Sequence, residues 1–237
     1  MRFPASIFLI LSLIAVPASA ASPDEATARR QLQHWLIDLA DDDAQVRETA
    51  RMQLMGISRG ELRMFRDVVA QSRPLLPAQA VALRDIVLQA YASGEPYEPD
   101  RREGFLGIEL STVELPVQRP EGLQASGVLV VSRMLGFGAY RMLQDGDIIL
   151  GVLDRPNARI GEFMDLATII RSIPPGTAIR IEVYRRGRII TVPITLDARP
   201  ADLARFENLD AFRSVRFRRA YEYWRNYFAP LIEQGIS

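Results

Sequence analysis

Residues 104–108 read GFLGI, and the order of the segments that follow this stretch decides the fold. Residues 143–149 read LQDGDII, a polar turn that leads into an apolar run. Residues 162–173 have the spacing of an amphipathic helix and end at a Pro-Pro-Gly turn. Residues 179–196 alternate between polar and apolar around an Arg-Gly pair, which predicts a β-hairpin. The stretch therefore opens a β-rich region that contains one clear helix.

These segments, in this order and at these separations, resemble a PDZ domain in the arrangement used by bacterial HtrA-type envelope proteases. The resemblance covers about residues 104–197, within the usual size of a domain. It implies an antiparallel β-sandwich or partly open barrel, with a groove between an open strand edge and the helix of residues 162–173. Such a domain binds the C-terminus or an extended segment of a peptide as an added strand.

The predicted binding loop of this groove is residues 106–108. Gly107 lets the chain turn so that backbone N–H groups converge on a peptide carboxylate, and a Cβ there is expected to clash with the peptide. Arg101 and Arg102, just upstream, are expected to favour an anionic peptide end. Spacing does not decide which helix residues face the groove. The predicted peptide-binding residues are Leu106, Gly107, Ile108, Glu109, Leu110, Leu166, Ile169 and Ile170.

Phe105 and the aspartates of the DGD turn are expected to shape the structure of this region and not to carry chemistry. Phe105 is bulky for a carboxylate-binding loop, and we expect it to fill part of the pocket. Asp145 and Asp147 are interpreted as residues that shape the turn before a strand, because they stand in a DGD turn with no other metal-ligating residues nearby.

Residues 22–93 are predicted to form an all-α bundle of about four helices, followed by a linker over residues 94–103. Asp43, Val46 and Leu54 belong to a pattern that resembles one half of a HEAT-type helical repeat. Solenoids usually need three or more repeats and this region has room for two, so a compact bundle is the main prediction. The linker contains two prolines and six charged residues, which argues against a periodic element there.

Residues 200–237 are predicted to form a helical tail that starts at Pro200 and ends near Pro230. Its apolar stripe alternates spacings of four and three and is flanked by arginines. Three interpretations stay open: docking onto the chain's own domains, dimerisation or partner binding, and peripheral contact with an anionic membrane surface. The stripe consists of Phe217, Tyr221, Trp224, Phe228 and Leu231.

The composition narrows the chemistry that the 237 residues can perform. The 29 basic and 29 acidic residues cancel, which argues against a nucleic-acid partner. The absence of cysteine excludes thiolate catalysis, disulfides and zinc–sulfur sites. The one histidine, His34, lies in the helical region beside Trp35, so no Ser-His-Asp triad is expected. We therefore expect no enzymatic activity, no cofactor and no metal site.

Residues 1–20 read as a secretory signal peptide with cleavage after Ala20. Arg2 supplies the positive charge, residues 7–16 form an apolar run too short to span a bilayer, and residues 18–20 fit the small-residue cleavage pattern. An uncleaved anchor or a buried helix is the alternative. The signal peptide predicts a periplasmic or secreted protein.

The sequence as a whole predicts an α+β, exported, non-catalytic peptide-binding protein. It would act as an adaptor or scaffold in the bacterial envelope, with a peptide of another protein as its partner. Two alternatives stay open: a regulatory subunit of a separate envelope protease, and a structural protein with a vacant groove.

Overall fold

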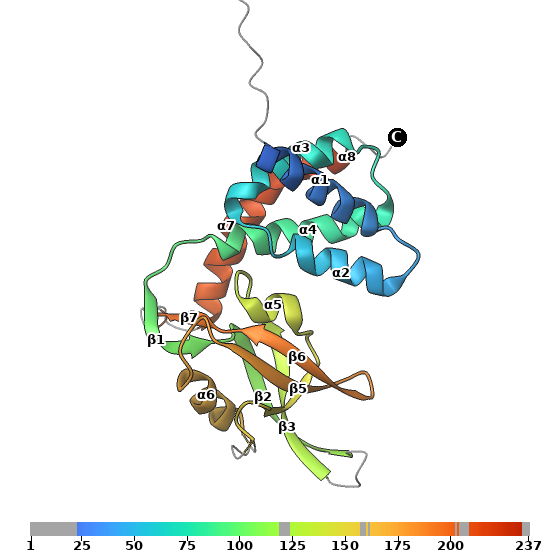
Figure 1. Cartoon of the computed structure of the whole chain (residues 1–237). Helices are drawn as coiled ribbons and strands as arrows, with labels where there is room; N and C mark the ends of the chain where they lie inside the picture. The colour runs from blue at the N-terminus through green and yellow to red at the C-terminus, as the bar shows by residue number, and fades with distance from the viewer. Residues whose placement is uncertain are drawn as a thin grey trace, which may run out of the picture.

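The structure, a computed structural model, describes residues 23–118, 124–156, 160, 162–201, 203 and 209–233. It is mixed α+β, with a helical part and two antiparallel sheets, and within these ranges neither sheet closes into a barrel. The helical part lies at one end, the sheets lie at the other, and the long helix α7 runs between them (Figure 1). The predicted signal peptide and its cleavage site lie outside the described residues.

The helical part consists of four helices that share one apolar core with α7. Asp43 begins the second helix, because its carboxylate accepts a hydrogen bond of 2.7 Å from the backbone N–H of Gln45. The predicted HEAT-type arrangement stays a prediction. The helices are α1 (Pro23–Asp38), α2 (Ala44–Leu54), α3 (Leu62–Gln71) and α4 (Pro77–Ser93), with a 3₁₀ turn over Arg59–Glu61 between α2 and α3.

The larger sheet has the order β2-β3-β4-β5-β6, so β2 lies at one edge. Arg186 and Gly187 join its last two strands with φ values of 50° and 82°, the positive angles that a tight hairpin turn needs. Two helices pack on this sheet, α5 (Gly138–Met142) and α6 (Phe163–Arg171). The strands are β2 (Ile108–Gln118), β3 (Gln124–Arg133), β4 (Ile148–Val152), β5 (Ala178–Arg185) and β6 (Arg188–Thr195).

The smaller sheet corrects the prediction of a linker over residues 94–103. A strand, β1 (Pro99–Phe105), starts inside that range and pairs with β7 (Asp197–Pro200). Pairing between backbones about a hundred residues apart leaves no local sequence pattern, which is why the strand was not predicted. Gly104 permits the close approach of α6, because a Cβ there would lie 2.8 Å from the carbonyl oxygen of Ile170.

The C-terminal helix also differs from its prediction. Pro200 ends β7, α7 (Leu209–Tyr227) begins nine residues later, and Pro230 lies inside a further short helix, α8 (Ala229–Glu233). Phe217 and Tyr221 of the predicted apolar stripe are 44% and 38% exposed. The buried ridge instead repeats every four residues, and it packs α7 onto its own chain. Its members are Phe212, Arg216, Ala220, Trp224 and Phe228.

No helix in the described part of the chain is both long and apolar enough to cross a bilayer. Contact with a membrane surface and dimerisation stay predictions.

Candidate functional site

An apolar groove with a volume of about 460 Å³ lies between the edge strand β2 and the helix α6. One wall is the end of β1, the connecting loop and the start of β2, residues 104–110. The opposite wall comes from α6, and a third group of residues comes from β7 and the chain that follows it. The residues outside the 104–110 wall are Met164, Leu166, Ala167, Ile170, Arg171, Arg199, Leu203 and Leu209.

All the predicted site residues except Ile169 line this groove. Leu166 and Ile170 are one helical turn apart, so they share the face of α6 that closes the groove, and both are buried. Ile169 does not line the groove; it is partly buried and packs against the same core cluster that contains Leu166 and Ile170. The groove wall therefore omits Ile169 and includes Met164 and Ala167, which the sequence analysis missed.

The backbone of Ile108 faces the open edge of the sheet. The residues Ile108 and Arg133 are partners across β2 and β3. The neighbouring backbone N–H of Met134 donates a hydrogen bond of 2.7 Å to the carbonyl oxygen of Gly107. In an antiparallel ladder, this pattern makes the Ile108–Arg133 pair a non-hydrogen-bonded one, whose N–H and C=O groups point away from each other. The N–H and C=O groups of Ile108 therefore point away from β3, where an added strand can reach them.

Gly107 is required by the protein's own backbone conformation and packing. Its φ of +69° is a conformation that favours glycine, and a Cβ there would lie 2.6 Å from Cβ and Cγ of Phe137. A Cβ at residue 107 would therefore clash with the protein's own core, while the expected clash with a bound peptide stays a prediction. Phe105 packs edge-on against the same ring at a centroid distance of 5.0 Å while it also lines the groove. Phe137 thus supports the binding loop from behind.

The positive charges at the groove are not the predicted ones. Arg101 and Arg102 are exposed and do not line the cavity, whereas Arg171 and Arg199 do. Arg199 donates a hydrogen bond of 2.9 Å from Nη1 to Oε2 of Glu103, so much of its charge is balanced within the ribbon of β1 and β7. Arg171 is exposed in the last turn of α6 and is the more accessible of the two cations.

The turn before β4 is built on a buried carboxylate. Asp147 is 1% exposed, and its two oxygens accept hydrogen bonds of 2.8 and 2.6 Å from Nε and Nη2 of Arg185. It also accepts a bond of 2.7 Å from the backbone N–H of Gln144. Asp145 is exposed and pairs with Arg133 at 2.8 Å. Both aspartates therefore hold the turn, which agrees with their structural interpretation.

Asp197 lies close in the fold to the loop over residues 106–108, and burial shifts the pKa of its carboxyl group. It pairs with Phe105 across the small sheet and accepts a hydrogen bond of 2.6 Å from the backbone N–H of Gly138. Desolvation raises the pKa of Asp197, while the hydrogen bond and the charges of Arg216 and Arg141 lower it by less. The carboxyl group of Asp197 therefore keeps its proton to a higher pH in the folded protein than in the unfolded chain.

No protein-family model matches the chain. The chain is similar to proteins named as probable periplasmic DegP-like serine endoproteases. It is 28% identical to that of Bartonella henselae over 102 residues, 43% of this chain and 20% of the relative. It is 29% identical to that of Pseudomonas fulva over 120 residues, 50% of this chain and 23% of the relative. The chain thus spans about a fifth of the length of the curated relatives it matches.

These relatives support the resemblance to HtrA-type proteins over part of the chain, and they correct one expectation. The composition led us to expect no enzymatic activity, whereas the matching proteins are named serine endoproteases. The names of these relatives therefore contradict the expectation of no enzymatic activity.

Two solved structures also match part of the chain. An HtrA-type protease, AlgW with decapeptide, matches 51% of this chain and 35% of its own, with 23% identity and a TM-score of 0.34. A serine endoprotease from Yersinia pestis matches 41% of this chain and 29% of its own, with 23% identity and a TM-score of 0.32.

Proposed function

We propose that this chain is the peptide-binding region of a periplasmic protein related to HtrA-type serine endoproteases. It captures a C-terminal or extended segment of another protein in the groove between β2 and α6, by β-strand addition. In that role it holds a protein for proteolysis or delivers it to a protease. Export by a signal peptide cut after Ala20 is part of the proposal, and mass spectrometry of the N-terminus of the exported protein tests it.

The outward-facing backbone of Ile108 carries this proposal. A peptide laid antiparallel to β2 can exchange two hydrogen bonds with this residue and lengthen the sheet by one strand. Backbone hydrogen bonds of this kind do not depend on the peptide's sequence, so they provide affinity without selectivity. A single short strand is expected to bind with a dissociation constant in the roughly micromolar range, which corresponds to a binding free energy of about −8 kcal/mol.

Selectivity would come from the side chains that enter the groove. Alternate residues of an extended peptide point toward the same side, and here that side meets Leu110, Ala167 and the exposed Met164. These walls are apolar, and methionine adapts to ligands of different shape. We expect apolar side chains at alternate positions of the bound segment, with Arg171 favouring a carboxylate nearby.

Filling the groove from α6 tests the proposal. Ala167 lines the cavity, whereas its neighbour Thr168 is exposed and lies outside it. An array of ten-residue peptides, each with a free or an amidated C-terminus, would be screened by fluorescence anisotropy against the wild-type protein. The bound peptides should lose roughly tenfold or more in affinity for Ala167→Trp and keep it for Thr168→Trp. Equal binding by the two variants, or no peptide bound by the wild type, would overturn the assignment of the groove.

A further inference from the structure

The groove includes residues that lie beyond the expected PDZ-like region. Leu203 follows β7, and Leu209 is the first residue of α7; both line the cavity. Both also pack on a small apolar cluster of Met134, Phe137 and Phe212. The start of α7 therefore borders the space in which a peptide would lie.

The same helix is attached to the peptide-binding strand itself. Nη1 of Arg213 donates a hydrogen bond of 2.7 Å to Oε2 of Glu109, the β2 residue between Ile108 and Leu110. The same oxygen accepts a bond of 2.7 Å from Oγ of Ser132 on β3. The edge strand, its neighbour and α7 thus meet at one carboxylate.

The other half of α7 belongs to the core of the helical part. Trp224 of α7 and Phe228, the residue directly after the helix, are buried there, and α7 packs along α4. Between the two ends, Arg216 is 3% exposed and donates hydrogen bonds to the carbonyl oxygens of Leu135 at 3.2 Å and Ala92 at 2.5 Å. Its guanidinium lies 4.9 Å from the centroid of the Phe137 ring, which packs against Gly107.

We propose that α7 is a wall of the peptide groove and couples peptide binding to the docking of the helical part. This inference rests on the proposed function of the groove. A continuous helix of 19 residues touches the groove at its first residue, the edge strand at Arg213 and the helical core at Trp224. By linkage, a peptide that binds with α7 in place stabilises the docked arrangement, and loosening α7 weakens peptide binding by the same factor.

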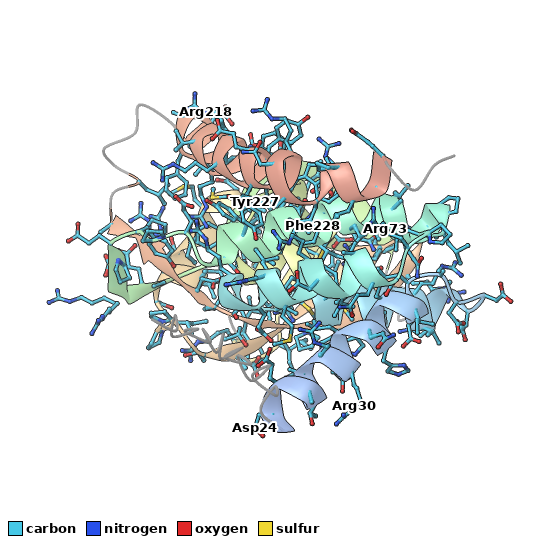
Figure 2. All side chains as sticks on the ribbon, turned by 90° about the horizontal axis from the view of Figure 1, so that it is seen from above. Asp24, Arg30, Arg73, Arg218, Tyr227 and Phe228 are labelled. Atoms are coloured by element: carbon cyan, nitrogen blue, oxygen red, sulfur yellow. The ribbon has the colours of Figure 1, made fainter. Side chains whose placement is uncertain are left out.

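Replacing Arg213 tests the coupling, with Arg218 as the matched control. Arg218 is on the same helix but projects to the outside (Figure 2), so its replacement removes a charge without touching β2. A fluorescein-labelled decapeptide from the array should bind Arg213→Gln roughly fivefold or more weakly than the wild type and bind Arg218→Gln within twofold. The double variant Glu109→Gln, Arg213→Gln should bind the peptide no more weakly than either single variant, because each substitution removes the same Arg213–Glu109 interaction.

Hydrogen exchange of the free protein provides a readout that needs no peptide. The amides of residues 106–110 should exchange faster in Arg213→Gln than in the wild type and remain unchanged in Arg218→Gln. Equal exchange in the two variants would overturn the coupling. Faster exchange with unchanged peptide affinity would overturn the role of α7 as a groove wall. If exchange responds but the wild type binds no peptide, the proposed function fails and the attachment of α7 to β2 stands.

Discussion

Gly107 lies directly against the ring of Phe137, so the loop that borders the groove is shaped by the core behind it. A Cβ on Gly107 would come within 2.6 Å of two atoms of that side chain. Phe137 is itself 1% exposed and contacts Phe105, Tyr97 and Arg216. The position of the loop is therefore determined by the core that Phe137 shares with Tyr97, Phe105 and Arg216 of α7.

Gly107→Ala should destabilise the fold by about 2–5 kcal/mol. The left-handed backbone costs about 1–2 kcal/mol for any other residue, and overpacking against Phe137 adds about 1–3 kcal/mol. Gly176→Ala is the matched control, because φ at Gly176 is +81° and nothing lies within 4 Å of its Cβ position. Urea unfolding should show the larger loss for Gly107→Ala. If the two variants lose equal stability, the contact with Phe137 is not responsible.

Asp147→Ala should cost about 3–5 kcal/mol of unfolding free energy. The substitution leaves Arg185, whose side chain is 20% exposed, without its main partner, and breaking a buried pair carries a cost of this size. Asp145→Ala, two residues away, removes an exposed pairing with Arg133 and should cost less than about 1 kcal/mol. Thermal or urea unfolding measures both. Similar losses for the two variants would contradict the assignment of Asp147 as the buried support of the turn.

The β-rich region was predictable because its elements have local patterns. The alternation over residues 179–196 and the helical spacing over residues 162–173 each depend on neighbours a few positions apart. The smaller sheet has no such pattern, since Asp100 pairs with Arg199 and Gly104 with Ala198 across about a hundred residues of sequence. Helix spacing likewise could not separate Ile169 from Ile170.

The groove's third wall and the burial of α7 depend on tertiary contacts. Leu203 and Leu209 are apolar residues of a tail, and nothing local indicates that they return to the groove. Arg216 is a charged residue in a buried ridge, which it occupies because the carbonyls of Leu135 and Ala92 accept its hydrogen bonds. A hydrophobicity pattern therefore selects Phe217 and Tyr221 instead, and both are exposed.

Asp197→Asn should change how stability depends on pH. Because burial raises the pKa of Asp197 above the ordinary 3.8, the folded protein keeps this proton at higher pH than the unfolded chain. Its contribution to stability is thus greatest below about pH 3.8 and falls as the pH rises through the raised pKa. Asparagine does not ionise, so the stability of the variant relative to the wild type should increase from pH 3.5 to pH 7.

Asp154→Asn is the control, because the pKa of Asp154 is shifted in the opposite direction from that of Asp197. The pKa of Asp154 is lowered mainly by a hydrogen bond from the Arg180 side chain and, to a smaller extent, by one from the backbone N–H of Arg180. The stability that this carboxylate contributes is present above the unfolded pKa and is lost as the pH falls through the folded value. The Asp154→Asn variant should therefore lose stability relative to the wild type from pH 3.5 to pH 7. Parallel pH profiles for the two variants, measured by urea unfolding, would show that burial does not raise the pKa of Asp197.

An alternating pattern of backbone hydrogen bonds should identify the bound peptide as an added strand. Only every second residue of an antiparallel strand directs its N–H and C=O toward β2, where the backbone of Ile108 receives them. N-methylation of a peptide residue in that register removes a donor and should weaken binding roughly tenfold. The next residue points its N–H away, so its methylation should leave the affinity within about twofold. Replacing the same amides by esters removes the N–H without adding a methyl group and should give the same alternation. A uniform loss, or none, in both series would mean that side chains alone hold the peptide and that the β2 edge is not extended.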